Sequence, residues 1–170
     1  MAPTVSLQFP TLQTQFQRSG FVVETIFSPT DVRQIRSLYE CLTNEFESPF
    51  HASMFSPNEK YRRTVYEQIR PLVEARIEAI LPGYRLCVAN FVVKETDKGD
   101  STVGMHQDWS FVNERSQSSL NLWFPLRDVD QQDGCMEVVP GTHRCSTHPR
   151  PHGDACRFQE VESEIRQRYL

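Results

Sequence analysis

The sequence predicts a single soluble domain in which N-terminal helices support an all-β core of the antiparallel sandwich or jelly-roll type. The chain has 170 residues, which is a usual length for one domain. Apolar residues recur every three or four positions in the first half, whereas from residue 84 onwards they follow a period of two. The second half also divides into short strand-like segments separated by Gly, Pro and Asp, as in antiparallel β-proteins.

Composition and charge exclude several classes of protein. The 11 Phe residues are too many large apolar side chains for a disordered segment. The net charge is -4, with Lys and Arg scattered, which argues against a nucleic-acid partner. No apolar run reaches the ~20 residues that span a membrane, and the first residues do not resemble a secretion signal. Five cysteines without a Cys-x-x-Cys pair favour a reducing, cytoplasmic location.

The first half is expected to begin with a strand and to continue as helices. Phe21–Ile26 is rich in β-branched residues, which favours a strand. The following Ser28-Pro-Thr-Asp31 places a capping serine, a proline and an acid where a helix begins, so a helix is predicted from about Pro29 to Glu47. Its apolar side chains form one stripe: Val32, Ile35, Leu38, Tyr39 and Leu42.

A second helix is predicted after Ser56-Pro-Asn-Glu59, which repeats the capping pattern with Ser56 as the cap. It ends at Pro82-Gly83, and Pro71 is expected to kink or split it. Its apolar positions are Tyr66, Ile69, Leu72, Val73, Ile77 and Ile80. Neither helix carries a polar cluster that suggests chemistry, so residues 28–82 are assigned to the helical support of the domain.

Three strands are expected in the β-core, residues 84–145. They are Tyr84–Lys94, Ser119–Leu126 and Cys135–Val139. A polar loop, an acidic connection and the Pro140-Gly141 turn separate or close them. The chain contains no GxGxxG, GxxxxGK(S/T), GxSxG or HExxH sequence, which removes the common dinucleotide-binding, phosphate-binding, hydrolase and zinc-protease classes.

His106 and Asp108 are the candidate metal ligands. Two residues apart on an extended chain, an imidazole and a carboxylate point to the same side and can reach one ion. They supply two-thirds of the two-His, one-carboxylate triad that binds non-haem Fe(II) and leaves positions open for a co-substrate and dioxygen. A His-x-Asp sequence also occurs by chance. The second example, His152-Gly-Asp154, lies in a Pro/Arg/Gly-rich loop where no strand fixes the side chains, and is interpreted as a decoy.

The stretch from His106 to Arg144 resembles the phytanoyl-CoA dioxygenase (PhyH-like) family. After the His-x-Asp pair come a segment with Asn and Trp (SLNLWF), the connection PLRDVD and the segment GCMEVVPGTH, in the order that the family shows. Phe16–Leu38 also resembles the family's N-terminal strand and helix. The resemblance covers most of residues 16–145.

The resemblance implies a double-stranded β-helix that holds Fe(II) with 2-oxoglutarate, which is decarboxylated to succinate as a C–H bond of the substrate is hydroxylated. It makes His106 and Asp108 the first two iron ligands. Hydroxylation is expected rather than halogenation because Asp108 is retained. Asn90 and Trp123 match positions that contact the co-substrate, although a purely structural role also suits a strand Asn or Trp.

Two further aromatic residues, Trp109 and Phe111, are assigned to the wall of the substrate pocket. There they would limit the access of water to the reacting atoms. Ordinary packing in the core is the alternative for both. A small organic molecule is expected as the substrate, and its identity is not implied by the family.

The chain departs from the family pattern towards its C-terminus. The family's second iron-binding His, and the Arg that grips the far carboxylate of 2-oxoglutarate, do not appear before Leu170. His143 is interpreted as a turn residue, and His148 and His152 lie in a Pro/Arg-rich loop. Residues 146–170 resemble a helical insertion of the family. The domain is therefore expected to be incomplete, either as a fragment of a longer polypeptide or as a homo-oligomer that covers exposed sheet edges.

Two alternatives to an active enzyme stay open at this point. A PhyH-like domain without the second His and the Arg would be a catalytically inactive scaffold or interaction module. A cupin-like metal protein would use the His-x-Asp pair for other chemistry. Joint binding of Fe(II) and 2-oxoglutarate that depends on His106 separates these possibilities.

Overall fold

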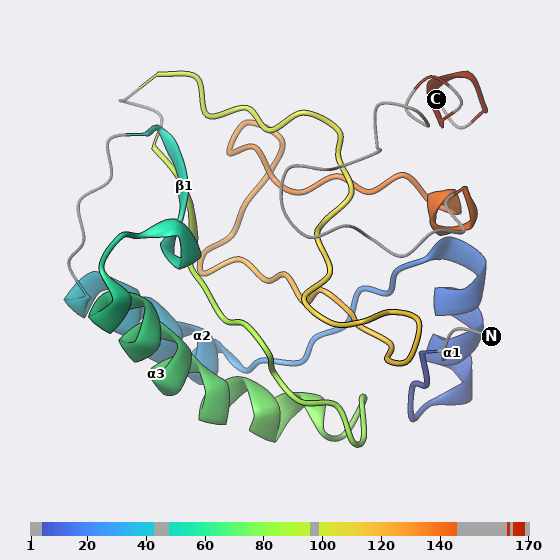
Figure 1. Cartoon of the computed structure of the whole chain (residues 1–170), viewed down its shortest axis with the longest axis horizontal. Coiled ribbons are helices and arrows are strands. Elements are labelled where there is room, and N and C mark those ends of the chain that lie inside the picture. Colours follow the sequence, from blue (N-terminus) through green and yellow to red (C-terminus); the bar gives the residue numbers. More distant parts are fainter. Residues whose placement is uncertain (1–4, 43–47, 96–98, 146–162, 164, 169–170) are drawn as a thin grey trace. The chain divides into compact units, whose positions relative to one another are not determined.

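The computed structural model describes residues 5–42, 48–95, 99–145, 163 and 165–168. Its main elements, in chain order, are helices α1 (Pro10–Ser19) and α2 (Pro29–Cys41), strand β1 (Phe50–Ala52), the 3₁₀ turn η1 (Ser53–Phe55), helix α3 (Glu59–Ile77), strand β2 (Val92–Lys94) and the 3₁₀ turn η3 (Thr142–Arg144) (Figure 1). None of the helices in the described part of the chain combines the length and the apolar character needed to span a bilayer.

The chain forms two compact units. The first comprises Met1–Glu24, Gly104–Phe124 and Cys135–Leu170, and the second comprises Thr25–Val103 and Pro125–Gly134. The second unit holds α2, α3 and the strands, and the first holds α1, η3 and the His-x-Asp pair at 106–108. The prediction of one domain over residues 1–170 stays a prediction.

Helix α2 begins with the capping box that its sequence predicts. The Asp31 backbone N–H donates to the Ser28 hydroxyl at 3.2 Å, and the Ser28 backbone N–H donates to the Asp31 carboxylate at 2.8 Å. Pro29 lies in the first turn, where its missing N–H removes no helical hydrogen bond. The predicted start is confirmed. The helix ends at Cys41 instead of Glu47, and residues 43–47 lie outside the described residues.

Helix α3 is one continuous helix whose buried side chains recur every four residues. They are Tyr61, Val65, Ile69, Val73 and Ile77. Helix α2 lies beside it and contributes Ile35, which is buried (Figure 1). Of the predicted kink or split at Pro71, the split is wrong and the kink stays a prediction. The proline lies on the exposed side, where water can bond to the carbonyl that lost its donor. The cap is Asn58, whose Oδ1 accepts a backbone N–H at 3.0 Å, and not the predicted Ser56.

Strands β1 and β2 pair in antiparallel fashion, with Ala52 opposite Val92. The Ser53 N–H donates to the Phe91 carbonyl at 2.8 Å and extends the pairing by one residue. The buried Phe91 ring meets Tyr39 of α2 edge-on, with 5.2 Å between the ring centres. This contact joins the small sheet to the helices of the second unit.

Fewer strands form than the sequence predicts. Within Tyr84–Lys94 only the last three residues are a strand. No strand is assigned to three other predicted segments, Phe21–Ile26, Ser119–Leu126 and Cys135–Val139. Their apolar side chains are often exposed, as for Val23 and Met136. A β-prone segment becomes a strand only where a neighbouring strand supplies hydrogen-bond partners. The one pairing among the described residues, β1 with β2, is antiparallel, and the jelly roll stays a prediction.

In the first unit, the turn η3 rests against the C-terminal end of α1, a helix that the apolar periodicity does not predict. Gly20 ends this helix in the left-handed conformation, with φ of 85°. A side chain at Gly20 would collide with the ring of His143. His143 Nε2 lies 3.2 Å from the Gln17 carbonyl, to which Arg144 also donates at 2.7 Å. These contacts agree with the structural role predicted for His143.

The Asp31 carboxylate makes the stability of the second unit depend on pH. Arg76 donates to Asp31 Oδ1 at 2.7 Å, and this bond and those from Ser28 lower the pKa of Asp31 from 3.8 to about 2. Since the pKa is lower in the folded state, the stabilisation is complete above the unfolded value and is lost as the pH falls towards 2. We expect Asp31→Asn to lower the melting temperature at pH 7, and the difference from wild type to shrink below pH 3.8.

Circular dichroism melting curves at several pH values measure this effect. Glu40→Gln is the control, because it removes the partner of Arg36 in an ion pair whose two side chains are each 54% exposed. An exposed pair of this kind contributes little to stability. A melting temperature of Asp31→Asn equal to that of wild type at pH 7 would contradict the prediction.

Candidate metal centre

The candidate centre is built on residues 104–121 of the first unit, where the chain turns back on itself. The Ser110 and Ser119 hydroxyls lie 3.2 Å apart across this turn, and Ser110 is fully buried. Two residues further out on each side, Asn121 Nδ2 donates to Asp108 Oδ2 at 2.7 Å. These two side-chain contacts are placed symmetrically about the turn, in a segment to which no strand is assigned. The turn brings Asp108 and Asn121 together.

His106 and Asp108 lie next to each other, as their spacing predicts. His106 Nε2 is 3.2 Å from Asp108 Oδ1. Each side chain is 53% exposed, so a ligand from solution can reach both. The two side chains therefore present one nitrogen and one oxygen donor on the same side of the chain.

The hydrogen bonds of His106 test whether this pair suits a cation. Its Nδ1 lies 2.8 Å from the Gly104 carbonyl, which can only accept, so Nδ1 carries the proton. Nε2 is then the ring nitrogen that faces Asp108 Oδ1, and a proton or a metal ion can bridge the 3.2 Å between these two atoms. Neighbouring ligands on an octahedral ion with bonds of about 2.1 Å are ~3 Å apart, so the pair fits a metal ion.

His106 and Asp108 would be two of the three ligands that a facial triad needs. Among them, no three His, Cys, Asp or Glu side chains are grouped so that they could hold a metal ion. His143 is engaged with the end of α1. His148, His152 and Asp154 lie outside the described residues, so neither the two histidines of the Pro/Arg-rich loop nor the decoy pair is placed.

The other predicted site residues divide between the two units. Trp109, Phe111 and Trp123 belong to the first unit, as do the ligands. Phe111 is 45% and Trp123 44% exposed, so these two rings are not enclosed in a core. Asn90 belongs to the second unit, and its side-chain oxygen is buried with no hydrogen-bond partner among the described residues. Their roles as pocket wall and co-substrate contacts stay predictions.

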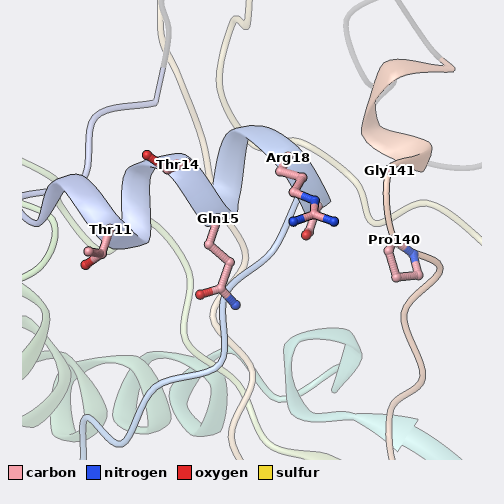
Figure 2. A pocket seen from close by; sticks show the side chains of 7 residues that line it. Thr11, Thr14, Gln15, Arg18, Pro140 and Gly141 are labelled. Atoms are coloured by element: carbon pink, nitrogen blue, oxygen red, sulfur yellow. The ribbon is translucent and has the colours of Figure 1, made fainter.

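Two open grooves lie elsewhere on the units. A groove of about 470 Å³ follows α1 in the first unit, where Thr11, Gln15 and Arg18 line it together with Pro140 and Gly141 (Figure 2). A smaller groove of about 240 Å³ in the second unit is lined by residues of η1, α3 and the segment 87–89. Neither groove is lined by His106 or Asp108. The candidate centre is thus an exposed pair of donors.

Comparison with protein families places this chain among known proteins. The family model described as phytanoyl-CoA dioxygenase (PhyH) matches residues 16–167. The chain belongs to the PhyH family. This confirms the resemblance carried by the His-x-Asp pair and the segments that follow it.

Two relatives show how far the similarity of this PhyH chain extends. It is 37% identical to a phytanoyl-CoA dioxygenase of Arabidopsis thaliana over 65 residues, which are 36% of this chain and 23% of that protein. It is 22% identical to the peroxisomal phytanoyl-CoA dioxygenase of Bos taurus over 165 residues, or 81% of this chain and 48% of the bovine protein. The chain thus spans about half the length of the bovine relative and less of the plant one. No solved structure matches it.

Asn121 is the residue of this PhyH chain that sequence analysis does not single out. The segment SLNLWF shows the family pattern but does not say which of its side chains meets Asp108. That contact depends on the turn closed by Ser110 and Ser119. Sequence separation could have indicated the contact, because Asp108 and Asn121 are equally many residues from the middle of this turn.

Proposed function

We propose that this chain is an Fe(II)- and 2-oxoglutarate-dependent dioxygenase that hydroxylates a small organic substrate. The observation that carries the proposal is the pairing of a nitrogen and an oxygen ligand atom, His106 Nε2 and Asp108 Oδ1, which lie 3.2 Å apart and are open to solvent. Membership of the PhyH family supports iron as the ion and 2-oxoglutarate as the co-substrate.

The chain's own residues would hold and orient the iron. His106 would bind it through Nε2, and the Gly104 carbonyl, which accepts from Nδ1, fixes the orientation of the ring. Asp108 would bind it through a carboxylate oxygen. When bound, iron and 2-oxoglutarate would supply the hydroxylation of a substrate C–H bond by dioxygen, in which one oxygen atom enters the substrate and the other enters the succinate formed with carbon dioxide. Trp109 and Phe111, next to the ligands in sequence, would contact the substrate and limit the access of water.

Trp123 and Asn90 are proposed as contacts of 2-oxoglutarate. For Trp123 the support is the family pattern, together with its place in the same unit as His106 and Asp108. For Asn90 the support is the family pattern together with its buried side-chain oxygen, which has no hydrogen-bond partner in the part of the chain that the structure describes.

The proposal also covers the fold, the self-association and the cellular location of the protein. A double-stranded β-helix supported by the N-terminal helices is the proposed fold of the single domain. Self-association would cover exposed apolar side chains such as Leu122 and Val138. The odd number of cysteines supports a cytoplasmic location. The peroxisomal location in a relative's name is a property of the bovine protein.

The second candidate function is a catalytically inactive PhyH scaffold or interaction module. It is favoured by one observation, that the described residues bring only two candidate ligands together. A metal protein of the cupin type with other chemistry would share the His106 and Asp108 pair but would not need 2-oxoglutarate.

Turnover of 2-oxoglutarate separates these functions. With Fe(II) and dioxygen, we expect the chain to release succinate from 2-oxoglutarate, and His106→Ala to lower this rate by at least ~100-fold because the ion loses a ligand. Succinate is measured by mass spectrometry, with Fe(II) omitted as the control. An equal rate in His106→Ala would contradict the proposal. Iron binding without succinate formation would favour the scaffold or the cupin-type protein.

A further inference from the structure

The two oxygens of the Asp108 carboxylate have different neighbours. Oδ1 faces His106 Nε2 at 3.2 Å, whereas Oδ2 accepts a hydrogen bond from Asn121 Nδ2 at 2.7 Å. A donated N–H occupies a lone pair of the oxygen that accepts it and restricts rotation of the carboxylate. Only Oδ1 is therefore directed to the place where an ion would meet His106.

We propose that Asn121 is a positioning residue that keeps Asp108 monodentate, so that it binds the metal ion through Oδ1 alone. This inference rests on the proposed function. Without the Asn121 amide, the carboxylate would rotate about its Cβ–Cγ bond and offer both oxygens. A bidentate Asp108 would occupy one more position on the ion, at the expense of the positions that a co-substrate and dioxygen need. Asn121 would thus control the number of open positions without touching the ion.

The surroundings of Asn121 favour this role over a contribution to stability. Asn121 is exposed and Asp108 is 53% exposed, so water competes for their hydrogen bond and its net stabilisation is small. The position of Asn121 is nevertheless fixed from inside the turn. Ser110 is buried, and Ser119 bonds both to it at 3.2 Å and to Glu114 at 3.1 Å. The buried serine holds the two exposed side chains in register.

Metal binding to the 170-residue chain tests the inference. Fe(II) affinity is measured by anaerobic titration calorimetry, and the number of water molecules on bound Mn(II) by water proton relaxation. We expect Asn121→Ala to remove one water from Mn(II), because Asp108 gains a second bond to the ion, and to weaken Fe(II) binding about 10- to 100-fold, because the freed carboxylate must then be ordered when the ion binds. Asn121→Gln keeps the amide and is expected to retain part of the Fe(II) affinity and of the water number on Mn(II). The matched control is Gln117→Ala, which removes an exposed amide within the same turn and leaves both unchanged.

The possible outcomes separate this inference from the proposed function. If Asn121→Ala matches wild type in affinity and water number, Asn121 has no positioning role and the proposed function still stands. If Asn121→Ala weakens the affinity but leaves the water number unchanged, Asn121 does not keep Asp108 monodentate. If Gln117→Ala loses as much affinity and water as Asn121→Ala, the effect belongs to the turn as a whole, and the inference is again overturned. If wild type binds neither Fe(II) nor Mn(II), both proposals fail. Melting curves from circular dichroism show that each variant is folded.

Discussion

His106→Ala and Asp108→Ala are each expected to weaken Fe(II) binding by more than about 100-fold. The two side chains present Nε2 and Oδ1 at 3.2 Å, so either substitution removes one half of the chelating pair. Both side chains are 53% exposed, and neither substitution takes a contact out of the core. The fold should therefore persist while binding is lost. Anaerobic titration calorimetry gives the affinities, and circular dichroism checks the fold.

The second His-x-Asp sequence of the chain provides the matched control. His152→Ala removes a histidine with the same spacing to an aspartate, and it is expected to leave Fe(II) affinity unchanged. Loss of binding in His152→Ala, together with normal binding in His106→Ala, would move the centre to the other sequence and would contradict the assignment. Loss in both variants would instead identify His152 as a further ligand.

The second large effect is expected in the core of the second unit. Ile35 of α2 and Val65 of α3 are each 1% exposed. Ile35→Ala removes buried carbon atoms and leaves a cavity, so the free energy of unfolding should fall by about 2–5 kcal/mol. Since domains are stable by only about 5–15 kcal/mol, the variant would lose a large fraction of its stability. Urea denaturation followed by circular dichroism measures the difference.

Gln34→Ala is the control for this variant, because Gln34 precedes Ile35 on the same helix and is exposed. Its free energy of unfolding is expected to stay within ~0.5 kcal/mol of wild type. If Ile35→Ala cost no more than Gln34→Ala, Ile35 would not be a core residue, and the packing of α2 on α3 would be wrong.

Helices were predicted where the signal is local. The capping box of Ser28 and Asp31 and the repeating apolar positions of α3 involve residues three or four apart, and both helices are found. Helix α1 is not predicted by apolar periodicity, because its sequence is rich in Gln and Thr and only Leu12 is buried. Pro10 and Gly20 nevertheless mark its ends. Strands depend on a partner far along the chain. The pairing of residues 50–52 with 92–94 could therefore not be foreseen from either segment alone.

The same distinction holds for the candidate metal centre. His106 and Asp108 are two residues apart, so an extended chain alone predicts that their side chains lie together. Asn121 is 13 residues from Asp108, and its contact requires the turn that Ser110 and Ser119 close. A third ligand comes from still further along the chain in the family pattern, where spacing carries no information about distance.

The most direct test of the dioxygenase proposal is an anaerobic titration of the 170-residue chain with Fe(II) and 2-oxoglutarate, followed by visible absorption. A charge-transfer band that requires both Fe(II) and 2-oxoglutarate, and that is missing in His106→Ala, is the predicted result. It would show that the pair at 106 and 108 and its partners hold iron and co-substrate together. If saturating concentrations produce no band, or the same band in His106→Ala, the proposed centre is contradicted.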